Sequence, residues 1–284
     1  KGDRFGFFPS FSTGWHVGRE SSMESIGFLS SLKLRGSWGE VGNQTTSSLY
    51  PAVPGLSITD YSDRSRVNWY NESAGSRYST LNLPNLVSSS FTWETVQTLN
   101  LGFDAGFFDN RLTTNFDWFR RKTLDMLAPG AELPGVLGAS APLENVADLE
   151  STGWELALSW NDKIGDFKYN IGATLYDYQS EITKFDNPAG LLSQFYEGRK
   201  FGEIWGYTTD GYYTFDDFEP GTVNMDPASA NYLRGGTLKA GIPFWEGRNQ
   251  NPGDIKYKDL NGDGLITDGN NTLEDSGDRS VIGN

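Results

Sequence analysis

Several residue types are scarce or absent, and each absence removes a class of chemistry. The 284-residue chain has no cysteine, which excludes disulfides, thiolate metal sites and cysteine nucleophiles. His16 is the one histidine, so a multi-histidine zinc site is excluded and a Ser-His-Asp triad would have a single possible base. No run approaches about 18 consecutive apolar residues, so the sequence contains no candidate transmembrane helix.

Basic residues are in the minority. The chain has 23 Lys and Arg residues and 37 Asp and Glu residues, which gives a formal net charge of −14. A surface of this charge repels nucleic acid. Only 37% of the residues are hydrophobic, yet 14% are aromatic, and 34 glycines and 12 prolines break the chain often. This composition favours an all-β protein whose apolar bulk is carried by rings.

Alternation of apolar with polar or glycine positions predicts two β-hairpins, each with one apolar face. Each strand core has about nine residues, the length that crosses a bilayer when tilted. A further strand at 31–39 has a possible antiparallel partner within 7–15. The four hairpin strands are predicted at 99–107, 112–120, 152–160 and 167–175.

The connections between the predicted strands alternate between short and long. The long ones cover 43–90, 123–150 and everything from about 184 onward. In a meander this order puts every short turn at one end of the sheet and every long loop at the other, as in outer-membrane barrels. Trp160, Phe167 and Phe107 flank the short turns, where an interfacial girdle of aromatic residues is expected. The strands of a soluble β-sandwich also alternate apolar and polar residues. A soluble or surface-attached β-sandwich that binds glycans is therefore the alternative interpretation.

An ordered series of short motifs resembles the SusC/RagA family of TonB-dependent outer-membrane transporters. The matches run through nearly the whole chain, and their order is more specific than any one of them. The main ones are Leu32-Lys33-Leu34-Arg35-Gly36-Ser37-Trp38-Gly39, Asn100-Leu101-Gly102, Phe108-Asp109-Asn110-Arg111-Leu112, Gly153-Trp154-Glu155, Gly253-Asp254-Ile255-Lys256-Tyr257 and Asp259-Leu260-Asn261-Gly262-Asp263-Gly264.

The resemblance implies a transmembrane antiparallel β-barrel of about twenty-two strands, plugged by an N-terminal domain. Residues 1–284 are then part of a single barrel domain, with about six strands and long extracellular loops, and the plug and the final strand lie outside this chain. The implied function is import of oligosaccharides or peptides across the cell outer membrane. The implied partners are a SusD-like surface lipoprotein, TonB and outer-membrane lipid, and no bond chemistry is expected.

The barrel interpretation assigns each strand residue to one side of the wall. Asn100, Asp104, Asn115, Asp117, Glu155, Lys168 and Asn170 are predicted to face the lumen. Leu101, Phe103, Phe116, Trp118, Leu156, Leu158, Tyr169 and Ile171 are predicted to face lipid.

The segment 259–270 has the spacing of a calcium loop, with oxygen ligands at alternate positions and glycine at the sixth. Position 12 should be an acid but is Asn270, and Asp268, Glu274, Asp275 or Asp278 could replace it only along a different loop path. A rigid, metal-free turn of Asp, Asn and Gly is the alternative. The candidate calcium ligands are Asp259, Asn261, Asp263, Leu265 and Thr267.

Two further groups of residues have open interpretations. The basic cluster Arg120-Arg121-Lys122 follows a strand's apolar core and either meets anionic lipopolysaccharide or is a solvated strand end. Rings in the long connections either pack those connections together or contact substrate or partner. These rings are Tyr61, Trp69, Tyr70, Tyr78, Phe195, Tyr196, Trp205, Tyr212, Tyr213, Phe244 and Trp245. No pair among the many carboxylates is singled out as a glycosidase pair.

Overall fold

The computed structural model describes most of the chain and divides it into two compact units, Lys1–Asp186 and Asn187–Asn284. Among the described residues, no helix is both long and apolar enough to cross a membrane. The described residues are 5–23, 26–44, 53, 55, 58–59, 70–71, 76–77, 80–81, 86–88, 92–130, 133–138 and 141–284.

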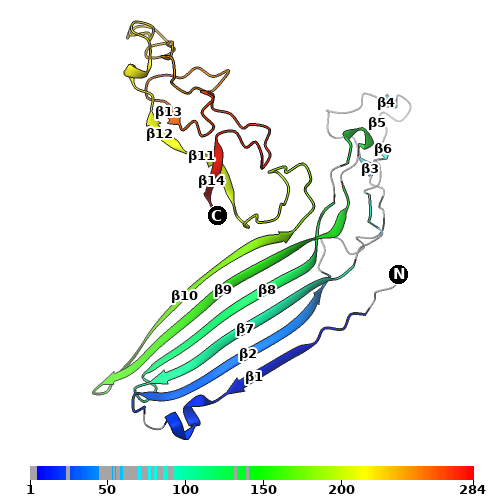
Figure 1. The fold of residues 1–284 in the computed structure, drawn as a ribbon, viewed down its shortest axis with the longest axis vertical. Helices are drawn as coiled ribbons and strands as arrows, with labels where there is room; N and C mark the ends of the chain where they lie inside the picture. The colour runs from blue at the N-terminus through cyan, green and yellow to red at the C-terminus, as the bar shows by residue number, and fades with distance from the viewer. Residues whose placement is uncertain are drawn as a thin grey trace. The chain divides into compact units, whose positions relative to one another are not determined.

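The first unit is built on one six-stranded antiparallel sheet in the order β1-β2-β7-β8-β9-β10 (Figure 1). The four hairpin strands and the strand at 31–39 with its partner are all confirmed, and most are longer than predicted. The strands are β1 (Ser10–Trp15), β2 (Leu29–Asn43), β7 (Glu94–Phe107), β8 (Leu112–Pro129), β9 (Leu143–Ile164) and β10 (Phe167–Lys184).

Short elements occur in the connections of this unit. Two 3-10 helices, η1 (Val17–Arg19) and η2 (Ser21–Met23), join β1 to β2, and η3 (Gly135–Leu137) lies between β8 and β9. Two-residue strands pair between β2 and β7: β3 (Ile58–Thr59) with β6 (Thr80–Leu81), and β4 (Tyr70–Asn71) with β5 (Ser76–Arg77).

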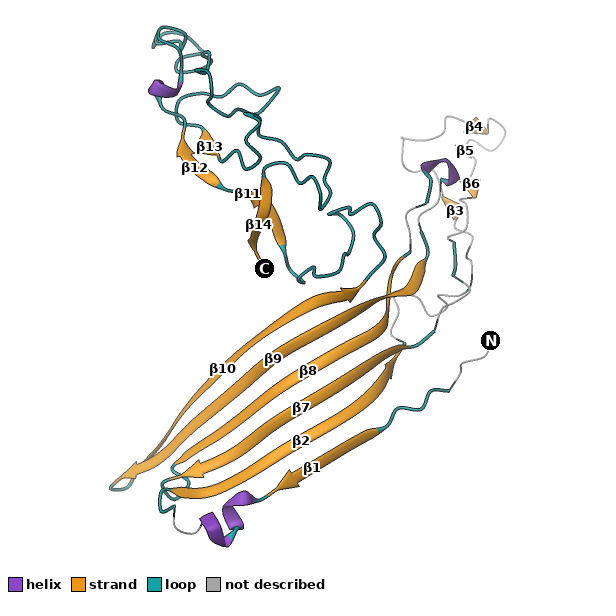
Figure 2. Ribbon diagram, viewed as in Figure 1, coloured by secondary structure: helices purple, strands orange, loops and turns teal. Residues whose placement is uncertain are grey.

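Short and long connections separate to opposite ends of the sheet, as predicted (Figure 2). The β7–β8 turn is tight because Phe108, Asp109 and Asn110 all adopt left-handed backbone angles, with φ of 55°, 58° and 61°. The Asn110 side chain folds back over Gly106, where an added Cβ would lie 2.1 Å from the Asn110 Oδ1 atom. A larger residue at position 106 would therefore have to displace the Asn110 side chain from this turn.

The strand registers give the sheet one apolar and one polar face. Leu34, Phe103, Phe116, Leu156 and Leu175 lie directly opposite one another across five strands. The registers put the two predicted residue sets on opposite sides of the sheet, the apolar set on one side and the polar set on the other. Leu175 remains 55% exposed, and no second sheet covers the apolar face within the described residues. A single layer is what the barrel interpretation predicts, and a sandwich would have covered this face.

Aromatic residues border both ends of the apolar face. At the short-turn end, Phe28 stacks on Phe107 with ring centroids 6.2 Å apart, and Phe108 lies 6.3 Å from Trp160. Towards the other end, Trp118 and Trp154 lie directly opposite each other. These positions match the two aromatic girdles of a membrane barrel. The six strands form an open piece of barrel wall in this chain.

The second unit is a compact folded module. Strand β11 (Ile204–Tyr207) pairs with β14 (Arg279–Gly283), and β12 (Thr209–Tyr212) pairs with β13 (Ile255–Tyr257). The 3-10 helix η4 (Phe215–Asp217) follows β12. The buried side chains of the second unit include Leu192, Tyr196, Tyr213, Phe218, Ile266 and Asp278.

Candidate functional site

An ion-pair network crosses the polar face of the six-stranded sheet. Arg35 on β2 donates to both carboxylate oxygens of Asp117 on β8, at 3.0 and 2.9 Å. Its Nε atom also contacts Asp104 on β7, at 3.1 and 3.2 Å. Arg35 and Asp117 are both directly opposite Gly102 on the strand between them. Since glycine has no side chain, the guanidinium reaches over β7.

The carboxylates of Asp104 and Asp117 share this one guanidinium, so one negative charge has no cation of its own. An uncharged amide donates an additional hydrogen bond to Asp104. Asn115 donates from Nδ2 to Asp104 Oδ1 at 2.5 Å. The side chains of Arg35 and Asp117 are 29% and 17% exposed, so their bidentate pair is stronger than a fully solvated one. The network ties β2, β7 and β8 together on the polar side.

A hollow of about 660 Å³ adjoins this network on the polar face. The Phe119 ring lies across Gly153, where an added Cβ would be 2.7 Å from the ring tip. Tyr178 on β10 lies directly opposite Gly153, on the side of the glycine away from Phe119. The Phe119 ring therefore lies flat along the polar face of the sheet, over Gly153. The hollow is lined by Arg35, Thr98, Asn100, Asp117, Phe119, Arg121, Ser151, Glu155, Tyr176 and Tyr178.

Two charges in the hollow are left uncompensated within the described part of the chain. Arg121 and Glu155 form no ion pair there, whereas Arg35 and Asp117 neutralise each other. The hollow thus combines aromatic faces with an available guanidinium and an available carboxylate. Such a surface can stack on flat apolar faces of a solute and hydrogen-bond its polar groups.

The predicted calcium ligands lie together in one tight loop of the second unit, with most of their oxygens occupied by N–H groups. Asp259 accepts from the backbone N–H of Gly262 at 2.6 Å and of Gly264 at 2.8 Å. The bond from Gly264 is the main cause that holds the pKa of Asp259 below its usual value. A carboxylate that accepts backbone N–H groups remains charged more readily.

The other predicted ligands continue this pattern. Asn261 Oδ1 accepts from the Asp263 N–H at 2.9 Å, and Asp263 Oδ1 accepts from the Leu265 N–H at 2.7 Å. Thr267 Oγ1 accepts from the Gly269 N–H at 3.3 Å. These side-chain-to-backbone bonds form a series of turns along the loop. Within the described residues, no three acidic or histidine side chains group as a metal site would. Calcium at this loop stays a prediction.

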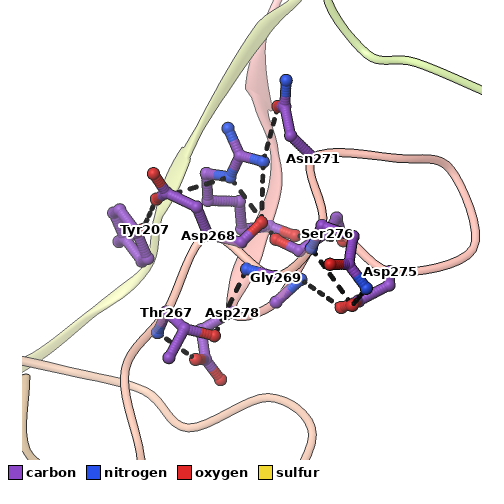
Figure 3. Close-up of polar contacts among 11 residues, drawn as sticks. Tyr207, Thr267, Asp268, Gly269, Asn271, Asp275, Ser276 and Asp278 are labelled. Atoms are coloured by element: carbon purple, nitrogen blue, oxygen red, sulfur yellow. Dashed lines mark hydrogen bonds and ion pairs between the residues drawn. The ribbon is translucent and has the colours of Figure 1, made fainter. Parts of the chain in front are cut away.

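Asp278 anchors the base of the same loop. Its buried carboxylate accepts from the backbone N–H groups of Leu260 and Thr267, both at 2.8 Å. Residues 268–277 separate Asp278 from the motif and carry their own contacts (Figure 3). Arg279 donates to the Asp268 carbonyl at 3.0 Å and to Asn271 at 2.9 Å.

Tyr207 links β11 to this segment. Its hydroxyl donates to the Asp268 carboxylate (Figure 3). Burial first, and this bond second, raise the pKa of Tyr207 above its usual value. The ring of Tyr207 also packs 4.8 Å from Trp245 and 5.4 Å from Tyr257, so it holds two parts of the module together.

The aromatic residues singled out from the sequence divide into several groups. Tyr196 and Tyr213 are buried, so they pack the module. Tyr212 is 66% and Phe244 39% exposed. Phe195 packs beside Phe201 and is half-buried, as are Trp205 and Trp245. Tyr61, Trp69 and Tyr78 lie outside the described residues, and Tyr70 is described only as part of β4.

The sequence reasoning missed the role of Gly102 and Gly153. The signal was present, because both glycines interrupt polar positions of otherwise regular strands. Recognising them also required the neighbours of each strand, and β2 and β7 are separated by a connection of about fifty residues.

Comparisons with known proteins agree with this architecture. The family model "TonB dependent receptor-like, beta-barrel" matches residues 1–278. TonB-dependent receptor P3 of Formosa agariphila is 26% identical over 297 residues, which cover 100% of this chain and 26% of that protein. TonB-dependent receptor SusC of Bacteroides thetaiotaomicron is 28% identical over 186 residues, or 65% of this chain and 18% of that protein.

Solved structures show the same fold. The RagAB peptide transporter matches with a TM-score of 0.58 and 22% identity, over 72% of this chain and 22% of that chain. The RagAB peptide importer in its closed-closed state matches with a TM-score of 0.58 and 22% identity, over 82% of this chain and 25% of that chain. This chain spans about a quarter of the length of the P3 receptor.

The resemblance found in the ordered motifs is thus confirmed by both the family model and the curated relatives. The one-layered antiparallel sheet, with its apolar face bordered by aromatic residues, is the physical counterpart of that match. The chain belongs to the TonB-dependent receptor-like β-barrel family.

Proposed function

We propose that the complete receptor is an outer-membrane importer of SusC type, driven through TonB. The observation that carries this proposal is the two-faced single sheet, with an uncovered apolar side and a polar side that holds a hollow. In the whole barrel the apolar side contacts lipid, and the polar side lines the lumen. The short turns then lie on the periplasmic side and the long connections of the sheet on the outer side.

The proposed cargo is an oligosaccharide or a peptide. The peptide part of this range is supported by the RagAB structures, which are described as a peptide transporter and importer. The oligosaccharide part rests on the resemblance of the sequence motifs to the SusC/RagA family. The lumen-side hollow suits either cargo, since rings accompany the available charges of Arg121 and Glu155. A SusD-like lipoprotein on the outer side completes the proposed assembly, and the barrel wall does no bond chemistry.

Uptake by cells tests the importer. A strain without the complete receptor should lose accumulation of labelled oligosaccharides or peptides, and removal of TonB should have the same effect. The Phe119→Ala variant should reduce uptake, because the substitution removes one of the aromatic faces that line the hollow. Uptake that persists without TonB would contradict the proposal. Extraction by high salt without detergent would instead favour a surface-attached glycan-binding module.

A further inference from the structure

The apolar face ends in a charged group formed by Arg120, Lys122 and Glu150. Arg120 Nε lies 3.4 Å from one Glu150 oxygen, and Lys122 Nζ lies 3.3 Å from the other. The registers put all three on the same side of the sheet as Trp118 and Trp154. Arg121, between the two cations, points to the opposite side and lines the lumen hollow. The three side chains are called the outward triad below.

The outward triad lies just beyond the aromatic border of the membrane face. Trp118 is directly opposite Trp154, and Arg120 comes one residue pair further along the same side of β8. In membrane barrels such rings mark the interface, and the lipid phosphates lie next to them. On the topology proposed above, this end of the strands is the outer end.

The triad keeps donor capacity for an additional anion. Arg120 engages Glu150 through Nε, which leaves both terminal nitrogens of the guanidinium without another partner among the described residues. The side chains of Arg120 and Lys122 are 44% and 43% exposed. One carboxylate between two cations leaves one net positive charge.

The neighbours determine from which side an anion can approach. Glu181 on β10 is directly opposite Glu150, so that side repels an anion. On β7 the residues opposite Arg120 and Lys122 are Leu99 and Gln97, which are uncharged. Glu40 lies one strand further away and accepts a hydrogen bond from Gln97 at 2.8 Å. Glu40 is thus as many strands from Lys122 as Glu181 is, so both ends of this row repel an anion. An anion therefore fits best over Arg120, whose partners on the neighbouring strands, Leu99 and Thr152, are both uncharged.

We infer that the outward triad binds the phosphate of a lipid headgroup in the outer leaflet. Planar guanidinium donors bind phosphate oxygens in pairs, and an ammonium adds a point charge. The apolar face directly beneath, from Leu101 to Leu156, is the surface on which the acyl chains of such a lipid would lie. This inference rests on the outward facing that the proposed function assigns to the apolar side.

Retention of lipid by the purified complete receptor tests the inference. Native mass spectrometry would compare a phosphorylated lipid A-type glycolipid with its dephosphorylated form. The wild-type receptor should retain the phosphorylated form about tenfold better, as expected for two cations near a membrane surface. The R120Q/K122Q variant should lose this preference, and E150Q should increase it. R121Q is the matched control, since it removes a lumen-facing charge from the same strand and should retain the wild-type preference.

Three results would overturn the inference: equal retention of both lipids by the wild type, an unchanged preference in R120Q/K122Q, or an equal loss in R121Q. Excess inorganic phosphate should leave the lipid bound, and its displacement would assign the triad to a free phosphate instead. Heat-modifiable migration on gels checks that each variant is folded. Uptake assays in the same strains keep the two proposals separate, because lost lipid preference with normal uptake affects only this inference.

Discussion

Arg35 and Asp117 belong to strands that do not pair with each other, yet their side chains form two hydrogen bonds across Gly102. An added Cβ at Gly102 would lie 2.5 Å from Asp117 Oδ1 and 3.2 Å from the Arg35 Nη2 atom. The pair therefore depends on the residue between its members as much as on the members themselves.

The Gly102→Ala substitution should separate this ion pair and destabilise the barrel by about 1–3 kcal/mol, the range for overpacked sites. Folding titrations of the complete receptor into lipid vesicles would measure the change. Gly172→Ala is the matched control, because a Cβ at that position on the same face meets only a carbonyl oxygen at 3.7 Å. Equal costs at the two glycines would contradict the explanation.

The cost of a lipid-facing charge should depend on depth. Leu175 lies in the middle of the apolar rows, opposite Leu156, whereas Ile171 lies opposite Trp160 at the short-turn border. Leu175→Arg should cost about 2–4 kcal/mol, and Ile171→Arg should cost about 0–1 kcal/mol. Thr174→Arg faces the lumen and serves as the neighbour control in the same vesicle titrations. A Thr174 variant as costly as the Leu175 variant would reverse the assigned facing.

Asp278 should control the rigidity of the loop at 259–270. The Asp278→Ala variant leaves the Leu260 and Thr267 N–H groups without their acceptor, at a cost of about 1–3 kcal/mol. Limited proteolysis should then cut this loop faster than in the wild type. Cleavage at an unchanged rate would show that the Asx turns alone hold the loop.

Calcium binding by the same loop has its own readout. If the predicted ligands bind the ion, calcium at about 10⁻⁴–10⁻³ M, the range of extracellular modules, should slow cleavage of the wild-type loop. The Asp263→Asn variant should respond less, because it removes a charged ligand. Cleavage that ignores both calcium and chelator would leave the hydrogen-bonded turn as the complete explanation.

The second unit should loosen at low pH through Asp217. The Thr214 N–H donates to its carboxylate at 2.7 Å, and Lys256 lies 3.3 Å from its other oxygen. These contacts, with the Thr214 backbone bond the largest, hold the pKa of Asp217 below its ordinary 3.8. A depressed pKa stabilises the folded state above pH 3.8 and ceases to do so as the pH falls through the lower folded-state value.

Hydrogen exchange of residues 214–218 should therefore lose protection in acid, after correction for intrinsic rates. The Asp217→Asn variant should have lower protection at neutral pH and a flatter pH profile below pH 3.8. A variant whose pH profile matches the wild type would show that other carboxylates are responsible.

The strands could be predicted from the sequence because apolar and polar residues alternate along each of them, and this local alternation shows on which side of the sheet each residue lies. The hairpins at 99–120 and 152–175 needed only their own residues and turns. The network around Arg35 could not be predicted in the same way, since it depends on β2 lying next to β7 across a long connection. Facing is a local property, whereas adjacency is set by the whole sheet.

The fold of the second unit could not be predicted from the sequence, for a different physical reason. Its fold depends on side chains that bind backbone groups far along the chain, as Asp278 does with Leu260. Such contacts produce no period in the sequence. The local motif at 259–267 was visible, and Asp278 was considered only as a replacement calcium ligand. Its role as the anchor of the loop could not be predicted, because it depends on the path of the ten intervening residues, 268–277.

The alternation of Arg120, Arg121 and Lys122 between the two faces of β8 has a consequence for inheritance. Deletion of a single codon between the β7–β8 turn and Asp117 would send Arg121 outward and both of its neighbours inward, and would exchange the faces of Asp117 and Trp118 as well. Deletion of two codons would restore the facing but shift the partners along the neighbouring strands. Changes of length within such strands should therefore be eliminated by selection, and variation in length between related receptors should accumulate in the connections.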